Sequence, residues 1–141
     1  MLDVFLRGAT PPANFHLAIV TNSPAPTVDT NTLGELTEIP AGNGYTAGGQ
    51  VVARNNTDWP TLTEDDALDR ATAIMASKVW TASGGTLPSS GDGFHAVLTD
   101  ANGTLGSREV LAFWSFGGPA RVSAGQTLTV PSATIVAQQG S

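Results

Sequence analysis

Few side chains of this 141-residue chain have the types and spacing that chemistry needs. The two histidines, His16 and His95, stand inside apolar, strand-like stretches, next to Phe15 and Phe94 respectively. A protein metal site normally takes three or more protein ligands, so two imidazoles alone do not predict one. We expect both histidines to be half-buried or at a strand surface, and we expect no metal site.

Carboxylates are concentrated in one stretch of the sequence. Glu64, Asp65 and Asp66 are contiguous, and Asp58 and Asp69 flank them. These groups could coordinate calcium, but they lack the D-x-D-x-D-G spacing that sets the geometry of a calcium loop. The favoured interpretation is a turn exposed to water.

Motifs for nucleophilic and phosphate chemistry are missing. The chain has no cysteine, which excludes disulfides, thiolate metal sites and a cysteine nucleophile. Neither G-x-S-x-G nor S-x-x-K occurs. The glycines within 42–44 and 48–49 lack the following Lys-Ser or Lys-Thr of a phosphate loop, so they are turn glycines. The sequence therefore predicts no catalytic residue, no cofactor and no enzyme.

Exposed aromatic faces could stack on sugar rings, which is the remaining candidate chemistry. Trp80 and Trp114 stand in predicted strands beside apolar neighbours, as core residues do, whereas Trp59 precedes a proline and is the best candidate for exposure. A core role is favoured for the aromatic set, which is Tyr45, Trp59, Trp80, Trp114 and Phe116.

The charge balance narrows the possible partners. Only 13% of the residues are charged, and the formal net charge is −6. Such a chain lacks the basic surface that binds nucleic acid or an anionic membrane. Its first residues lack the basic region of a signal peptide, and its apolar runs are shorter than a membrane span, so we expect a soluble, unexported protein.

The abundance of turn-forming residues, 16 glycines and nine prolines among them, favours short strands and tight turns. Residues 23–32 are predicted to form a surface loop and 40–49 a run of turns. Residues 94–99 and 109–116 are predicted to form a hairpin that Gly117-Gly118-Pro119 closes. Further strands are expected at 15–21, 33–39, 50–54, 126–130 and 134–136.

Residues 63–79 allow two interpretations. Thr63 and Asp66 resemble a capping box, and the apolar residues after them follow a helical stripe. Residues 70–76 also alternate as a strand does, and the β-rich triplet 79–81 follows them. The many strands around this segment favour extended structure.

Seven or eight short strands at regular spacing predict an all-β fold, an antiparallel β-sandwich or jelly roll. The apolar residues of 1–7 share one helical face, and Gly8 and Pro11-Pro12 end any helix there. We expect an N-terminal arm or short helix at 1–14, a single sandwich domain at 15–136 and a tail at 137–141. The arm and the tail are expected to touch neighbouring molecules.

Several phrases of the sequence, read in order, match a pattern known from other proteins. They are FLRG at 5–8, PPANFHLAIVTNSP at 11–24, ELTEIPAGNGYTAGG at 35–49 with GYTAGGQ at 44–50, VWTA at 79–82, FHAVLTD at 94–100, VLAFWSFG at 110–117 and VSAGQTLTV at 122–130. The chain in this respect resembles a family of small β-sandwich proteins in the virions of tailed bacteriophages, whose members are described as capsid decoration, cement or tail-fibre proteins. It departs from the family pattern in a longer acidic insert at 55–69.

The resemblance implies a non-enzymatic virion protein, most directly a capsid decoration protein that binds and stabilises the outer surface of an HK97-type shell. A tail or head-fibre protein is the alternative, and a host-glycan binding module is the third, favoured if Trp59 and Tyr45 flank a shallow groove. The implied partners are the major capsid protein and further copies of the chain, as a homotrimer. The implied location is the virion, assembled in the host cytoplasm. Expected contact residues are Leu2, Phe5, Leu6, Arg7, Pro11, Pro12, Tyr45 and Trp59.

Overall fold

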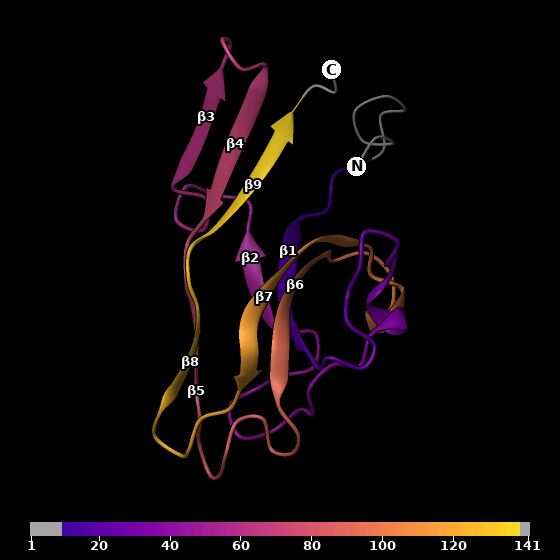
Figure 1. Ribbon diagram of the computed structural model, residues 1–141, viewed down its shortest axis with the longest axis vertical. Helices are drawn as coiled ribbons and strands as arrows, with labels where there is room; N and C mark the ends of the chain where they lie inside the picture. Colours follow the sequence, from indigo (N-terminus) through magenta and orange to yellow (C-terminus); the bar gives the residue numbers. More distant parts are fainter. Residues whose placement is uncertain (1–9, 139–141) are drawn as a thin grey trace.

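The computed structural model describes residues 10–138 and confirms the all-β prediction (Figure 1). Every strand pairing is antiparallel, and the helical elements of the described chain are two short 3-10 helices. None of the described helices is long and apolar enough to cross a membrane. The elements are β1 (Asn14–Val20), η1 (Leu33–Glu35), β2 (Gln50–Ala53), β3 (Thr61–Asp65), β4 (Arg70–Met75), β5 (Lys78–Thr81), β6 (Gly93–Asp100), η2 (Leu105–Ser107), β7 (Val110–Ala120), β8 (Thr127–Val130) and β9 (Ala133–Gln138).

The centre of the molecule is a four-stranded sheet of order β2-β1-β6-β7, and both faces of this sheet are covered. Successive residues of a strand point to opposite faces. Leu17 and Ile19 of β1 enter one apolar cluster, Ala18 and Val20 enter the other, and all four are fully buried. The continuous apolar run of β1 is therefore that of a strand with core on both sides.

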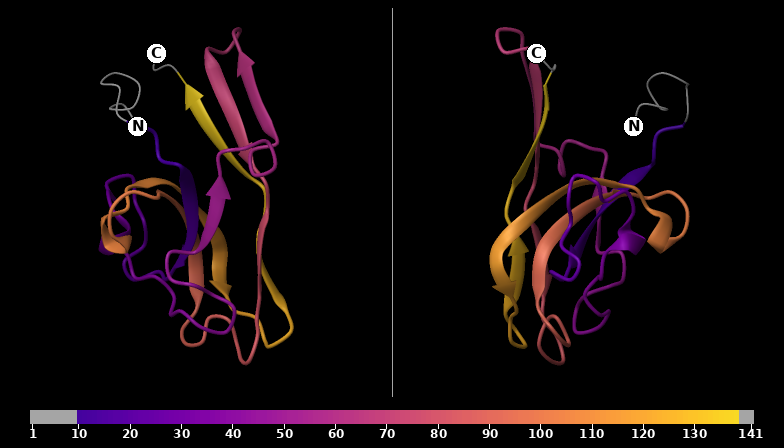
Figure 2. Two further views of the ribbon diagram at one scale, coloured as in Figure 1. Left: turned by 180° about the vertical axis from the view of Figure 1, so that it is seen from behind. Right: turned by 45° about the vertical axis from the view of Figure 1, so that its right-hand side comes forward.

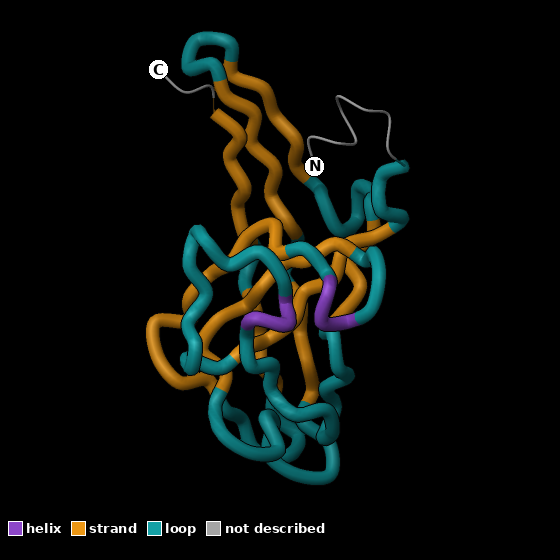
Figure 3. Tube along the Cα trace, turned by 90° about the vertical axis from the view of Figure 1, so that its right-hand side faces the viewer, coloured by secondary structure: helices purple, strands orange, loops and turns teal. Residues whose placement is uncertain are grey.

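One of these clusters lies between the central sheet and the two-stranded pair β5-β8. Trp80 of β5 and Leu128 of β8 are directly paired across this second sheet, and both are buried against the first. The other cluster is covered by loops that carry η1 and η2, which lie side by side (Figure 3). Leu33 and Leu36 pack there against Val97 of β6. The body is thus a small β-sandwich whose outer face is closed by loops.

A third sheet, of order β3-β4-β9, extends beyond the body (Figures 1 and 2). It continues the β5-β8 pair, because β4 leads into β5 across residues 76–77 and β8 leads into β9 across residues 131–132. Two chain segments therefore form one long antiparallel ribbon. Its lower half closes the core. The foot of its upper half still contributes the buried Met75 of β4 and Ala133 of β9 to that core, and the rest, with β3 added, extends past the end of the body (Figure 1). We call β3-β4-β9 the projecting sheet.

The structure corrects the expected strand at 33–39. This segment begins with the 3-10 helix η1, whose start is held by a hydrogen bond from the Thr32 amide to Glu35 Oε1 at 3.0 Å. Leu33 and Leu36 are buried, and their spacing of three places both on one side of a 3-10 helix. The strand pairing of this segment is limited to one isolated β-bridge, between Glu38 and Val20.

The structure confirms one of the other predicted segments and shifts the ends of two more. The extended interpretation of 63–79 is confirmed, since β3, β4 and β5 cover it and no helix forms there. Strand β7 does not stop at Gly117; it runs to Ala120, because Gly117 adopts a φ of 77° inside a bulged register. Strand β9 likewise passes the expected domain boundary at 136. The helix or arm expected at 1–7 lies outside the described residues.

Gly49 occupies a position where the backbone tolerates no side chain. Its φ is +74°, and an added Cβ would lie 1.8 Å from the carbonyl oxygen of Leu17 on β1. Gly118 is a matched contrast, because an added Cβ there would meet nothing within 4 Å. The bend at Gly49 is what lets the chain turn into β2 while it touches β1.

We predict that Gly49→Ala lowers the free energy of unfolding by more than about 1 kcal/mol, whereas Gly118→Ala changes it by less. The reasons are the positive φ and the backbone clash at residue 49. Urea unfolding followed by circular dichroism measures both. Equal stability of the two variants would contradict the prediction.

Candidate interaction surface

The two histidines lie on neighbouring strands but too far apart to share a ligand. His16 of β1 is paired with Thr99 of β6, and His95 of β6 is paired with Val20 of β1. Four residues along a strand separate the two positions, roughly 13 Å at 3.3 Å per residue. Burial and the charge of Arg108 lower the pKa of His16, which favours its neutral form. Among the described residues, no three His, Asp or Glu side chains are grouped to hold a metal ion.

The acidic stretch forms the tip of the β3-β4 hairpin, as the solvated-turn interpretation expects. Glu64, Asp66 and Asp69 are exposed, and Asp65 pairs with Arg70 at 3.5 Å. Asp58 does not join them. Its carboxylate accepts hydrogen bonds from Lys78 Nζ and from the Ala53 amide, both at 2.6 Å. The five carboxylates therefore belong to two separate places.

Tyr45 is buried, which corrects its expected role as a contact residue. Its hydroxyl donates to Glu38 Oε1 at 2.5 Å and accepts a hydrogen bond from the Ile19 amide at 2.9 Å. The Gly48 amide also donates to Glu38 Oε1. Burial raises the pKa of both Glu38 and Tyr45, and the charge of Glu38 adds to the increase at Tyr45. These hydrogen bonds hold the turns of 40–49 against β1. The Tyr45 hydroxyl is enclosed, so a ligand cannot reach it.

The aromatic residues do not form a sugar-stacking platform. Trp80 is buried beside Tyr45, with ring centroids 6.2 Å apart. Trp59 lies elsewhere, edge-on to Phe15 at 6.1 Å, and is only half-buried. Because Tyr45 and Trp59 do not share a groove, the feature that would favour a glycan-binding module is not formed.

Exposed apolar side chains occur on the projecting sheet. Leu62 of β3 is 77% exposed and Val136 of β9 is 49% exposed. Strands β3 and β9 each pair with β4 alone, so within residues 10–138 both outer edges of this sheet lack a partner strand. Unpaired edges with exposed apolar residues are surfaces that other chains can join.

An apolar groove of about 550 Å³ lies where the projecting sheet meets the body. Leu62, Ala73 and Ile135 of the projecting sheet are direct neighbours across its three strands and face this groove. The body contributes Phe15, Trp59, Leu98 and Leu111, and residues 54–56 form a polar rim. We call this feature the junction groove.

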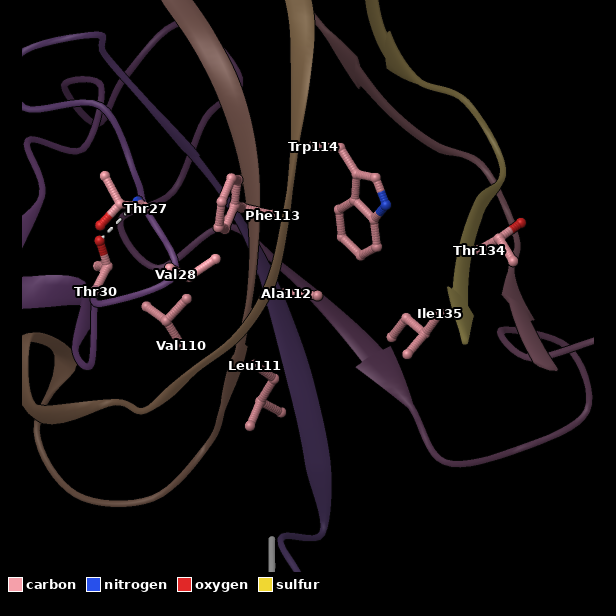
Figure 4. A pocket seen from close by; sticks show the side chains of 10 residues that line it. All are labelled: Thr27, Val28, Thr30, Val110, Leu111, Ala112, Phe113, Trp114, Thr134 and Ile135. Carbon is pink, nitrogen blue, oxygen red and sulfur yellow. Dashed lines mark hydrogen bonds between the residues drawn. The ribbon is translucent and has the colours of Figure 1, made fainter. Parts of the chain in front are cut away.

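A second hollow continues the junction groove around the edge of β7, and the two share Leu111 and Ile135. Figure 4 shows Trp114 of β7 and Ile135 of β9 in the space between these two strands, apart from Val28. Val28, at the far side, is 93% exposed. The outer edges of β7 and β9 therefore border one continuous depression.

The expected contact residues divide into three groups. Pro11 is exposed, Pro12 is half-buried, and Trp59 lines the junction groove, so these three lie at or near the candidate surface. Tyr45 lies in the core. The sequence interpretation missed Leu62 and Ile135, although Leu62 between two threonines carries the alternation of a strand with one apolar face. The remaining four, Leu2, Phe5, Leu6 and Arg7, lie outside the described residues.

Comparison with known proteins adds no assignment, because no family model, no curated protein and no solved structure matches this chain.

We predict that Tyr45→Phe lowers the free energy of unfolding by roughly 1 to 3 kcal/mol, because the Ile19 amide and Glu38 lose their shared partner. Thr99→Val is the matched control. The Thr99 hydroxyl is buried without a hydrogen-bond partner, so its removal should be neutral or stabilising. Chemical denaturation of both variants measures the difference, and a Tyr45→Phe variant as stable as Thr99→Val would contradict it.

The Asp58–Lys78 pair should make stability depend on pH. Burial raises the pKa of Asp58, but hydrogen bonds from Lys78 and Ala53 and the lysine charge outweigh it, so the pKa is lowered from 3.8. The stabilisation is present above 3.8 and is lost as the pH falls through the lowered folded value. Lys78→Met should cost roughly 1.5 to 3 kcal/mol at pH 7. Denaturation across pH should show this cost shrinking in acid, and a constant cost would contradict the assignment.

Proposed function

We propose that this chain is a non-enzymatic structural protein of a tailed-bacteriophage virion, and specifically a capsid decoration protein on the outer surface of an HK97-type shell. The sequence phrases described above support the choice of family. The described residues supply no grouped metal ligands, and the polar constellation around Tyr45 is enclosed. These two observations fit a binding role better than a catalytic one.

The observation that carries the proposal is the projecting sheet. Beyond its foot at Met75 and Ala133 it extends past the body, has two unpaired edges within the described residues, and exposes Leu62 and Val136. A neighbouring protein can add a strand to such an edge, with main-chain hydrogen bonds that need no charged side chains. This mode of contact suits a chain in which only 13% of the residues are charged.

The free edge of β9 is the favoured contact within this sheet. Val136 projects from β9 and is half exposed, whereas the tip of β3 and β4 is acidic. An apolar strand edge beside an acidic tip fits a partner with an extended apolar segment and a nearby basic group. On the proposed function, that partner segment belongs to the major capsid protein.

The test is add-back of purified protein to phage particles whose own copy of this gene is deleted. We expect the protein to bind the heads and to raise the temperature at which they release DNA. Val136→Glu should weaken head binding several-fold. Val79→Glu should not, since Val79 is similarly exposed, at 44%, but lies on β5 in the lower half of the ribbon.

Cryo-electron microscopy of the same particles locates the bound protein. Density on the capsid surface supports the proposal, and density on the tail alone would replace it with the fibre alternative. Absence of binding to either part would overturn it.

A further inference from the structure

The junction groove is an apolar surface that the described residues leave uncovered. Leu62 on its wall is 77% exposed, and Phe15 and Trp59, which also line it, are half-buried. Arg54 on its rim is exposed and donates a hydrogen bond from Nη1 to the carbonyl oxygen of Pro12 at 3.2 Å. A guanidinium has five N–H donors, so this bond leaves the rim with further donors and a positive charge. A matching occupant combines an apolar side chain with a carboxylate beside it.

The tip of the β3-β4 hairpin, residues 66–69, has this combination. Leu68 is 52% exposed, and the exposed carboxylates of Asp66 and Asp69 flank it. The turn has a defined shape, because the Leu68 amide donates to the carbonyl oxygen and to Oδ1 of Asp65, both at 3.2 Å. An apolar side chain on an ordered turn loses little conformational entropy when it is buried by a partner.

Small side chains separate the tip from the groove on the inner face of the projecting sheet. Ala71 of β4 and Ala137 of β9 are paired two residues beyond Ala73 and Ile135, so they point to the same side. Both alanines are exposed, and their size lets another sheet approach closely. Glu64, the third residue of this row, lies on the outer edge of β3, where its carboxylate is exposed.

We propose that two copies of this chain exchange hairpin tips, so that Leu68 of each copy enters the junction groove of the other and Asp66 pairs with Arg54. Leu68 lies six residues beyond Leu62, up to roughly 20 Å along the sheet. Two antiparallel copies can therefore place each tip at the other's groove, and the two-fold axis closes the assembly as a dimer. The outer edge of β9 stays free, and the inference does not rest on the proposed function.

Sedimentation of the full-length chain tests the proposal. The natural protein should form a dimer whose population rises with concentration. Leu68→Glu should weaken the dimer tenfold or more, because it places a charge in the apolar groove. The matched control is Val79→Glu, which changes a similarly exposed residue, at 44%, on the lower half of the ribbon and should leave the dimer unchanged.

A charge exchange tests which surfaces meet. Arg54→Glu and Asp66→Lys should each weaken the dimer several-fold, because tip and rim then carry like charges. An equimolar mixture of the two variants should restore dimerisation, since both contacts of the mixed dimer join opposite charges. Arg121→Glu is the control, because Arg121 is exposed outside the groove, where it bonds Thr86 and Gly91.

Unchanged circular dichroism shows that each variant is folded. A natural chain that stays a monomer would leave the groove to a different protein and overturn the proposal. Equal weakening by Leu68→Glu and Val79→Glu, or a mixture that associates no better than its components, would also overturn it. A closed oligomer larger than a dimer would contradict the two-fold exchange.

Discussion

Strand β1 has core on both faces, so every polar group along its backbone must find a partner within the protein. One edge is paired with β6, but β2 covers the other edge only as far as Leu17. Beyond that point the Tyr45 hydroxyl binds the Ile19 amide, and the Ile39 amide binds the Ile19 carbonyl oxygen. The turns of 40–49 exist in their observed form because they complete this edge, and they place Tyr45 where Trp80 packs on it.

The same packing determines where the ribbon leaves the body. Trp80 and Leu128 hold β5 and β8 against the central sheet, whereas β4 and β9 keep contact with the core only at their foot, through Met75, Ala133 and Ile135. The change occurs at 76–77, where the Ala76 amide binds the carbonyl oxygen of Asp58 and Lys78 pairs with the Asp58 carboxylate. A chain segment that precedes β3 thus fixes the foot of the projecting sheet.

Much of the fold could be predicted from local pattern. Three strands follow from local sequence: β1 from its apolar run, β6 from its alternation, and β7 from the turn signal that precedes it. The segment at 33–39 could not be read this way, because its buried residues obey a spacing of three set by tertiary contacts. Tyr45 was misassigned for a related reason: a tyrosine among glycines looks like an exposed turn until the β1 edge that needs its hydroxyl is known. The junction groove is lined by residues from β1, β3, β4, β7 and β9, which are far apart in the sequence, so no local sequence pattern predicts it.

The ribbon has a mechanical consequence. Because β4-β5 and β8-β9 are nearly continuous, a pull on the hairpin tip along the strands is carried by their ladder of hydrogen bonds straight into the sandwich. The bonds between β5 and β8 run across that direction, so they resist as a group in shear instead of opening one after another. The projecting sheet is in this sense a stiff extension of the sandwich, and a force applied along it reaches the core first at the buried Met75 of β4 and Ala133 of β9.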